Sequence, residues 1–213
     1  MTDPTKRSQI KRMPERGSHD RDVVDQIIDE ALICHVAFAD AEGRPVVIPT
    51  IHARIGETIY LHGSPASRML RVIPGQQVSI AFTHVDGLVL AKSHMHHSMN
   101  YRSVVAFGTA RKVTDPDEKT AGFQAVVENL VKGRWEGARQ PDEKEFRATS
   151  VVAIDIEEAS AKMRSGPPGD DEADLDLPYW AGVIPLRLTA ETPVGNGPDP
   201  IPDHVASWSP GRR

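Results

Sequence analysis

Hydrophobic and polar residues alternate along much of the chain, which is the pattern expected of β-strands. In the stretch 46–51 the even and the odd positions would face opposite sides of a sheet. After a turn around Gly56, the alternation continues in a second strand over 59–61. Ser64 and Pro65 then predict the start of a short helix, because a hydroxyl caps the first free N–H groups and proline suits the first helical position.

Two longer helices and several more strands are expected elsewhere. An apolar stripe at helical spacing predicts a helix over 20–32. Asp115 followed by Pro116 predicts the start of another helix, with a cap, a proline at its first position and acids in its first turn. Gly108 is expected to mark a bulge or a close approach of backbone. The other strands are predicted at 33–38, 77–83, 87–92, 102–112 and 149–156, with a turn at 86–87 and with 149–156 as the last clear strand.

These elements predict a mainly β fold with six or seven antiparallel strands in a barrel and flanking helices at its periphery. Residues 18–186 are expected to form the domain, residues 1–17 a flexible N-terminal arm and residues 187–213 a C-terminal tail. No G-x-G-x-x-G follows a strand and no G-x-x-x-x-G-K-[S/T] occurs, so the nucleotide-binding folds that carry those motifs lose support.

Composition narrows the class of partner. A net charge of −5 and a pI near 6.0 argue against a nucleic-acid surface or an anionic membrane surface. No apolar run approaches the roughly 20 residues that a membrane helix needs. The charged N-terminus lacks the apolar core of a secretory signal, and Cys34 stands alone, which excludes an internal disulfide. A cytoplasmic location is therefore expected.

Ser67 and Arg68 follow the predicted helix start and allow two interpretations. The free amides and the positive end of the helix dipole would suit a phosphate beside an arginine. The alternative is an ordinary capped helix with a solvated arginine.

Histidines supply the other candidate chemistry. His94, His96 and His97 lie within four residues and would suit a divalent metal or haem, or form a solvated loop. No carboxylate lies between Lys92 and Tyr101, which weakens the metal interpretation. His62 is a candidate proton donor, because the pKa of a histidine lies near neutrality, and it is equally a candidate structural side chain.

The order of several motifs resembles a known family. Two strands joined by a turn are followed by H-G-S-P-A-S-R and later by a strand with N-Y-R-S-V-V-A-F-G. The chain resembles the FMN-binding split-barrel proteins related to pyridoxamine 5'-phosphate oxidase, and within them the branch of nitroimidazole-resistance flavoproteins. The resemblance covers about residues 18 to 186. It implies a split β-barrel that forms a homodimer with two FMN molecules at the subunit interface.

The resemblance also implies which residues bind FMN. The strand 47–52 would run along the flavin ring and its ribityl chain, largely through backbone groups. Ser67 and Arg68 would hold the phosphate, for which the planar fork of arginine is well suited. Met69 replaces a second basic residue of the oxidase, and 177–188 does not match its substrate-binding segment, so oxidation of vitamin B6 is not expected. The expected cofactor-binding residues are Val47, Ile48, Pro49, Thr50, His62, Gly63, Ser64, Ser67, Arg68 and Ser103.

The function expected from these observations is that of an FMN-dependent oxidoreductase acting on a small molecule. The flavin would carry the redox chemistry, NADH or NADPH would reduce it, and His62 and Tyr101 are the candidate catalytic residues beside it. A second hypothesis is a flavin or haem carrier or sensor without turnover, with the cluster at 94–97 as the haem ligand. A third hypothesis keeps the barrel and replaces FMN with a deazaflavin.

Overall fold

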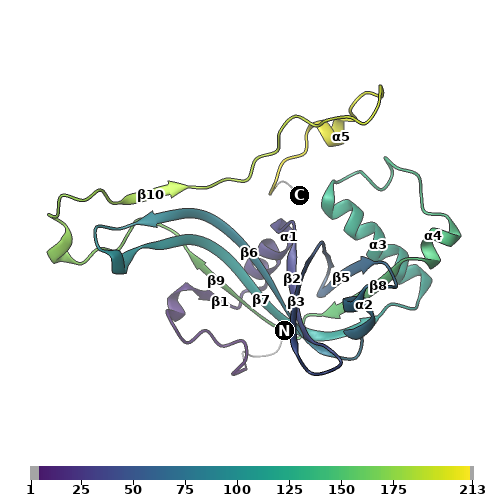
Figure 1. The fold of residues 1–213 in the computed structure, drawn as a ribbon, viewed down its shortest axis with the longest axis horizontal. Helices are drawn as coiled ribbons and strands as arrows, with labels where there is room; N and C mark the ends of the chain where they lie inside the picture. Colours follow the sequence, from purple (N-terminus) through teal and green to yellow (C-terminus); the bar gives the residue numbers. More distant parts are fainter. Residues whose placement is uncertain (1–4, 212–213) are drawn as a thin grey trace.

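A computed structural model describes residues 5–211 and shows a mainly antiparallel β structure with few helices (Figure 1). The fold class predicted from the sequence is confirmed. Residues 1–4 of the predicted arm and residues 212–213 of the predicted tail lie outside the described residues. The division into arm, domain and tail stays a prediction.

The helices and strands have the following bounds. The strands are β1 (Gly17–Ser18), β2 (Cys34–Ala39), β3 (Pro45–Thr50), β4 (Ala53–Ile55), β5 (Thr58–Gly63), β6 (Gln77–Leu90), β7 (Ser98–Lys112), β8 (Ser150–Asp155), β9 (Glu158–Arg164) and β10 (Gly182–Pro185). The helices are α1 (Arg21–Glu30), α2 (Arg68–Val72), α3 (Pro116–Leu130), α4 (Glu143–Arg147) and α5 (Asp203–Ala206). Short 3-10 helices are η1 (Pro14–Arg16), η2 (His94–His96) and η3 (Glu172–Asp174).

The sheet follows the order β3-β2-β6-β7-β8-β5-β4, with β9 added on β7, β1 on β9 and β10 on β6. The split of the barrel lies along β7. This strand pairs with β9 as far as Phe107 and with β8 from Ala110 onward. Gly108 lies between the two partners, and a Cβ built on it would stand 2.0 Å from the carbonyl oxygen of Asp155. The predicted close approach at Gly108 is confirmed, because only a glycine leaves room for that carbonyl.

The prediction of two strands separated by a turn at 86–87 is wrong. Both belong to β6, which pairs with β7 throughout and shifts register between Val85 and Gly87. The irregularity is a β-bulge, which bends a strand without ending it. Two tertiary contacts hold the strand there: Arg102 of β7 donates to both carboxylate oxygens of Asp86, and β10 pairs alongside.

The prediction that 149–156 is the last clear strand, and with it the count of six or seven, is also wrong. Within residues 5–211 the sheet has ten strands, because β9 and β10 follow β8 and β1 pairs with β9. The alternation in β9 buries Ala159 and Ala161. Alanine is a weak strand former, so the pattern was faint, and long-range pairing with β7 determines the strand.

The predicted helix start at Ser64 is wrong as well. The hydroxyl of Ser64 accepts from the N–H of Ala66, and its carbonyl accepts from the N–H of Ser67, which makes a turn. Ser67 is the N-cap of α2, and the helix begins at Arg68. Met69 and Leu70 are buried, so burial of these two side chains positions the helix. By contrast, α3 begins as predicted, with Asp115 accepting from the N–H of Glu118 and proline at its first turn.

The main core lies inside the barrel. The predicted apolar stripe forms α1, whose Val24, Ile27 and Ile28 are fully buried there against β2, β5, β6, β7, β8 and β9. A smaller core lies where α3 packs on β4, β5 and β8. Cys34 is buried, and desolvation raises the pKa of its thiol to about 12, so it behaves as a small apolar residue.

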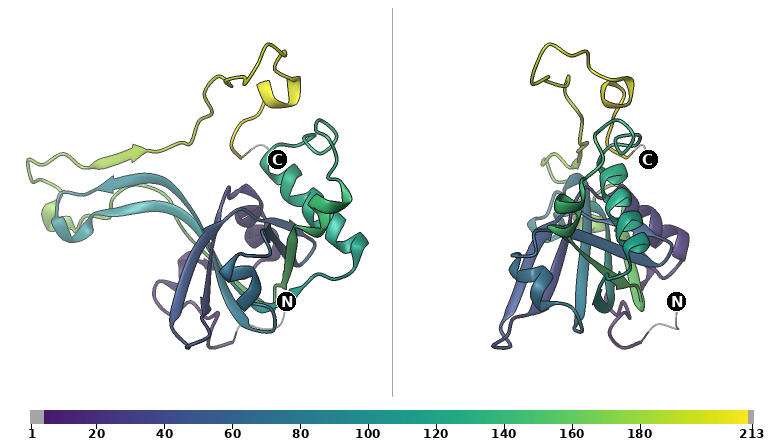
Figure 2. Two further views of the ribbon diagram at one scale, coloured as in Figure 1. Left: turned by 45° about the vertical axis from the view of Figure 1, so that its right-hand side comes forward. Right: turned by 90° about the vertical axis from the view of Figure 1, so that its right-hand side faces the viewer.

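Outside the barrel, β6 and β7 continue as a long hairpin with η2 at its tip (Figures 1 and 2). Strands β9 and β10 flank this hairpin. After β10, residues 187–211, here called the strap, run back above the barrel toward α3 and include α5 (Figure 2). Within residues 5–211 no helix has the length and apolar character needed to cross a membrane.

Substitution of Gly108→Ala is expected to lower the free energy of unfolding by about 2 kcal/mol or more, because overpacking against backbone costs energy in this range. Urea unfolding followed by circular dichroism measures the change. The matched control is Gly169→Ala, where nothing lies within 4 Å of the added Cβ and little change is expected. Equal stability of the two variants would contradict the close approach at the split.

Candidate functional site

One face of the sheet formed by β3, β2, β6 and β7 points away from the core and is here called the outer face. Along these strands the core-facing residues alternate with partly or fully exposed ones. Strand pairing aligns Pro49, His35, Ala81 and Val105 in one row across the four strands. The helices pack elsewhere, α1 on the core side and α3 on β4, β5 and β8. The outer face therefore presents a broad surface of mostly small and apolar side chains.

The outer face carries four of the residues predicted from the sequence. Val47, 60% exposed, and Pro49 lie on it at the β3 end, and Tyr101 and Ser103 lie on it along β7. Strands β3 and β7 are three strand spacings apart, which is roughly 14 Å. Ile48 points the other way and packs against the core, so β3 offers a ligand its backbone at this position.

Strand β3 lies at the end of the sheet order and pairs with β2 on one side. Its other edge therefore presents backbone N–H and C=O groups that the strand ladder does not use. The predicted flavin contact through backbone groups, which stays a prediction, would use this edge. The hydroxyl of Ser103 donates to the carbonyl of Lys162 at 3.1 Å, and its oxygen keeps acceptor capacity.

The predicted phosphate residues lie at the start of α2. The oxygen of Ser67 accepts from the N–H of Leu70 at the long distance of 3.5 Å, so this cap is weak. Arg68 is exposed, and among residues 5–211 no carboxylate pairs with its guanidinium. Its donors are therefore available to an anion.

The two predicted catalytic residues lie in different surroundings. The His62 ring lies beneath α3, 5.2 Å from the ring of Phe123, which in turn contacts the ring of Trp135 edge-on at 5.6 Å. The Nδ1 atom of His62 is buried without a hydrogen-bond partner in the described residues, and burial lowers the pKa of the ring, which favours its neutral form. Tyr101 lies on the outer face, opposite Val85 and Arg164. A single chain does not bring His62 and Tyr101 together.

The histidine cluster lies at the tip of the long hairpin. His94 and His96 belong to the short helix η2, so the extended geometry that would align them is not formed. His96 lies 3.3 Å from a carboxylate oxygen of Asp171, and Nδ1 of His97 contacts the carbonyl of Ser93 at 3.0 Å. In the part of the chain that the structure describes, no three histidine, cysteine or acidic side chains gather in a way that would hold a metal ion.

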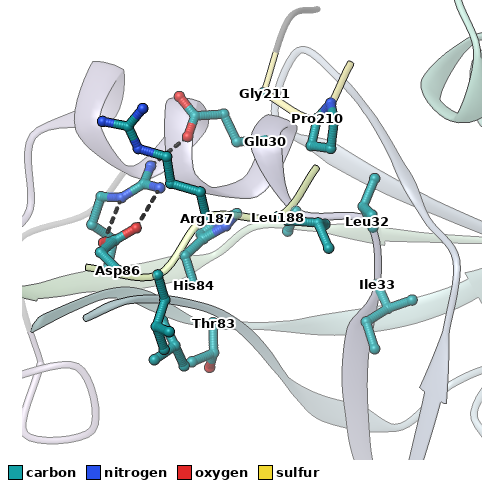
Figure 3. A pocket seen from close by; sticks show the side chains of 14 residues that line it. Glu30, Leu32, Ile33, Thr83, His84, Asp86, Arg187, Leu188, Pro210 and Gly211 are labelled. Carbon is teal, nitrogen blue, oxygen red and sulfur yellow. Dashed lines mark hydrogen bonds and ion pairs between the residues drawn. The ribbon is translucent and has the colours of Figure 1, made fainter. Parts of the chain in front are cut away.

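The sequence analysis missed a cavity of about 590 Å³ between the end of α1, the bulge of β6 and the strap. It is here called the strap cavity (Figure 3). Figure 3 shows Glu30, Asp86 and Arg187 gathered on one side and Leu32, Leu188 and Pro210 on the other. Local sequence patterns could not reveal the cavity, because its walls come from five segments spread along the chain between Glu30 and Gly211.

The charges of the strap cavity are largely paired. Arg102 donates to Asp86 through two bonds of 3.0 Å and also to Glu30. Hydrogen bonds to Asp86 and Glu30 raise the pKa of Arg102 above its usual value despite desolvation. Burial alone would raise the pKa of Glu30, but hydrogen bonds from Arg102 and Gln26 outweigh it and the pKa is lowered. The Glu30 carboxylate is thus ionised at neutral pH, and both carboxylates are engaged by Arg102.

Comparison with known proteins identifies the family. The sequence profile described as pyridoxamine 5'-phosphate oxidase matches residues 20–163. The chain belongs to this family, as its resemblance indicated. No curated protein matches the sequence.

Two solved structures match nearly the whole chain. The flavocytochrome Anf3 from Azotobacter vinelandii is 36% identical, with a TM-score of 0.88, covering 94% of this chain and 95% of Anf3. The FAD and heme binding protein from Mycobacterium smegmatis is 30% identical, with a TM-score of 0.85, covering 92% of this chain and 98% of that protein. A Bacteroides thetaiotaomicron protein described as a candidate for 5-nitroimidazole antibiotic resistance is 24% identical, with a TM-score of 0.58 over 68% of this chain and 85% of its own, and shares the fold.

Substitution of Arg102→Met is expected to lower the free energy of unfolding at pH 7 by about 2 kcal/mol, because two carboxylates lose a charged donor. The contribution of Glu30 has a defined pH dependence. Its folded-state pKa is lowered, so the stability it adds is present above the usual pKa of 4.5 and is lost as the pH falls through the folded-state value.

Urea unfolding at pH 7 and at about pH 3.5 measures both effects, and the difference between wild type and variant should shrink at the lower pH. The control is Arg187→Met in the same cavity, which has no carboxylate partner within residues 5–211 and should change stability little. An equal loss in both variants would contradict the assigned ion pairs.

Proposed function

We propose that this chain is a flavin-binding oxidoreductase in which the flavin lies against the outer face, at the interface of a homodimer. The observation that carries the proposal is the partly exposed outer face, which bears Val47 and Pro49 beside the free edge of β3 and Ser103 farther along the sheet, on β7. Membership in the pyridoxamine 5'-phosphate oxidase family and similarity to a flavocytochrome and to an FAD-binding protein support it.

The residues present fit a flavin. Small side chains on the outer face, such as Ala37 and Ala81, allow a flat ring to approach the strands. The free edge of β3 offers backbone donors and acceptors for the ring. The guanidinium of Arg68, which has no carboxylate partner within residues 5–211, suits a phosphate, with the hydroxyl of Ser67 beside it.

The kind of flavin is part of the proposal. FMN is the expectation from the sequence, whereas the Mycobacterium smegmatis relative is described as binding FAD. Both flavins contain the ring, the ribityl chain and the first phosphate, so the same residues serve either. A deazaflavin remains the third alternative, because no residue of the site separates it from FMN.

The flavin, when bound, supplies the transfer of electrons, and the chain supplies binding and orientation. The backbone of 47–50 orients the ring, and Arg68 and Ser67 hold the phosphate. Tyr101 lies on the same face as Ser103 and would contact a small-molecule substrate beside the ring. His62, neutral and partly buried, would hold or donate a proton at its unpartnered Nδ1 if the second protomer brings the reacting group to it. A cytoplasmic location belongs to the same proposal.

A second candidate function is haem binding, with or without turnover. The observation that favours it is coverage: the two relatives described as a flavocytochrome and as an FAD and heme binding protein match 94% and 92% of this chain. The match therefore extends well beyond residues 20–163, which the family profile covers. The ligand predicted from the sequence is the cluster His94, His96 and His97.

The first experiment is an absorbance spectrum of the purified protein together with mass spectrometry of the small molecules released on denaturation. A flavin spectrum and released FMN or FAD are expected. A colourless protein that takes up neither flavin on addition would overturn the proposal. With flavin bound, anaerobic reduction by NADH or NADPH tests the oxidoreductase function.

Substitution of Arg68→Ala is expected to weaken FMN binding by about 2 kcal/mol or more, which is the size of a lost charge-assisted pair. Quenching of FMN fluorescence on titration into flavin-free protein gives the dissociation constant. Arg71→Ala is the matched control, since Arg71 is an exposed arginine in the last turn of the same helix. Unchanged affinity in the Arg68 variant would remove Arg68 from the phosphate site.

The haem hypothesis predicts a Soret band when haemin is added to the protein, and loss of that band when His94, His96 and His97 are all replaced by glutamine. Replacement of His35, an exposed histidine on the outer face, is the control and should leave the band unchanged. A Soret band that survives the triple replacement would show that the ligand lies elsewhere. Absence of any spectral change would remove haem as a candidate.

A further inference from the structure

The strap cavity contains none of the residues predicted to bind the flavin, but it adjoins one of them, Ser103. Thr83 lines the cavity and pairs directly with Ser103 of the outer face. Its volume of about 590 Å³ lies within the range of pockets that bind small organic molecules. A ligand that extends to Thr83 would have one end next to Ser103.

Some charged groups of the cavity already form hydrogen bonds with one another, and one does not. Glu30 and Asp86 accept from Arg102, so both carboxylates and that guanidinium are engaged. Arg187 also lines the cavity, and in the described part of the chain its guanidinium has no hydrogen-bond acceptor or carboxylate partner. Its N–H donors are therefore the ones left to bind an anionic group such as a phosphate.

His84 adds an oriented acceptor. Its Nε2 atom lies 3.0 Å from the carbonyl oxygen of Ile27. Because a carbonyl oxygen only accepts, Nε2 carries the proton in the neutral ring and Nδ1 is left as an acceptor. The His84 ring lines the cavity, so a ligand with an N–H or O–H donor can be recognised there.

The side of the cavity opposite the charges is apolar. Leu32 comes from the segment after α1, Leu188 from the strap and Pro210 from the end of the described chain, and together they form one wall (Figure 3). Such a wall favours a flat, weakly polar ring and offers it few hydrogen bonds. The cavity is therefore complementary to a ligand with three features: a planar ring, an amide-type donor and a phosphate.

We propose that the strap cavity binds a nicotinamide nucleotide. The ring packs against Leu32 and Leu188, the carboxamide N–H₂ donates to Nδ1 of His84, and a phosphate binds the guanidinium of Arg187. The inference rests on the proposed flavin function in one respect, since it gives the proposed reductant a place beside the proposed flavin. Binding itself depends only on residues of the cavity.

Isothermal titration of the purified protein with tetrahydro-NADH, an analogue that cannot give up hydride, tests the proposal. Two half-molecules, nicotinamide mononucleotide and AMP, serve as competitors. The variants are Arg187→Met and His84→Gln, whose amide nitrogen can still donate to Ile27 while the acceptor at the Nδ1 position is lost. The control is Arg12→Met, an exposed arginine near the N-terminus.

Both cavity variants are expected to weaken binding of the analogue at least about tenfold, the effect of losing one charged or oriented hydrogen bond. The control should bind as wild type does, and nicotinamide mononucleotide should compete better than AMP. Equal affinity in all variants, stronger competition by AMP, or no binding by a correctly folded wild type would each overturn the proposal.

The flavin proposal is judged separately by the flavin content of the same preparations. Flavin-loaded protein that does not bind the analogue would refute the nicotinamide site and leave the flavin proposal intact. Protein that takes up no added flavin but binds the analogue through Arg187 and His84 would refute the flavin proposal and support the site.

Discussion

The split of the barrel depends on the absence of a side chain at Gly108. The turn between β8 and β9 brings the carbonyl of Asp155 to within 2.0 Å of where a Cβ would stand, and there β7 changes its partner from β9 to β8. Any other residue would push the two strands apart. With the split in place, β8 leads into the part of the barrel that α3 covers, and β9 stays beside the hairpin of β6 and β7.

That arrangement separates two surfaces that the proposed function would use. The core side of β6 and β7 is filled by α1, and the outer face remains for a flat ligand and a second protomer. At the row of Thr83 and Ser103 the outer face meets the strap cavity, whose charges are held by Arg102. A redox reaction between two bound molecules needs adjoining sites of this kind, one for each reactant. The strap covers the strap cavity, although its residues are far in sequence from the α1 and β6 residues that line the same cavity.

Local signals in the sequence predicted much of the fold. The apolar stripe of α1, the cap and proline of α3 and the alternation in β3 each depend on neighbours a few residues away. The predicted element bounds were wrong where contacts between distant residues determine the structure. Residues 158–164 have a faint strand pattern and form β9 because they pair with β7. Strand β6 continues past its bulge because Asp86 contacts Arg102. Burial of Met69 and Leu70 shifts the start of α2.

For the candidate site, the sequence alone determined the residue types and their order: an exposed alternating strand at 45–50, serine and arginine before a short helix, and a serine in the long strand. Such features persist because propensity, capping and alternation are properties of short segments. Only the tertiary structure decided which of them share a face. In the folded chain Val47 and Ser103 lie on the same outer face, His62 lies beneath α3, and α1, β6 and the strap form a cavity. These relations depend on strand register and on packing between residues that are far apart in the sequence.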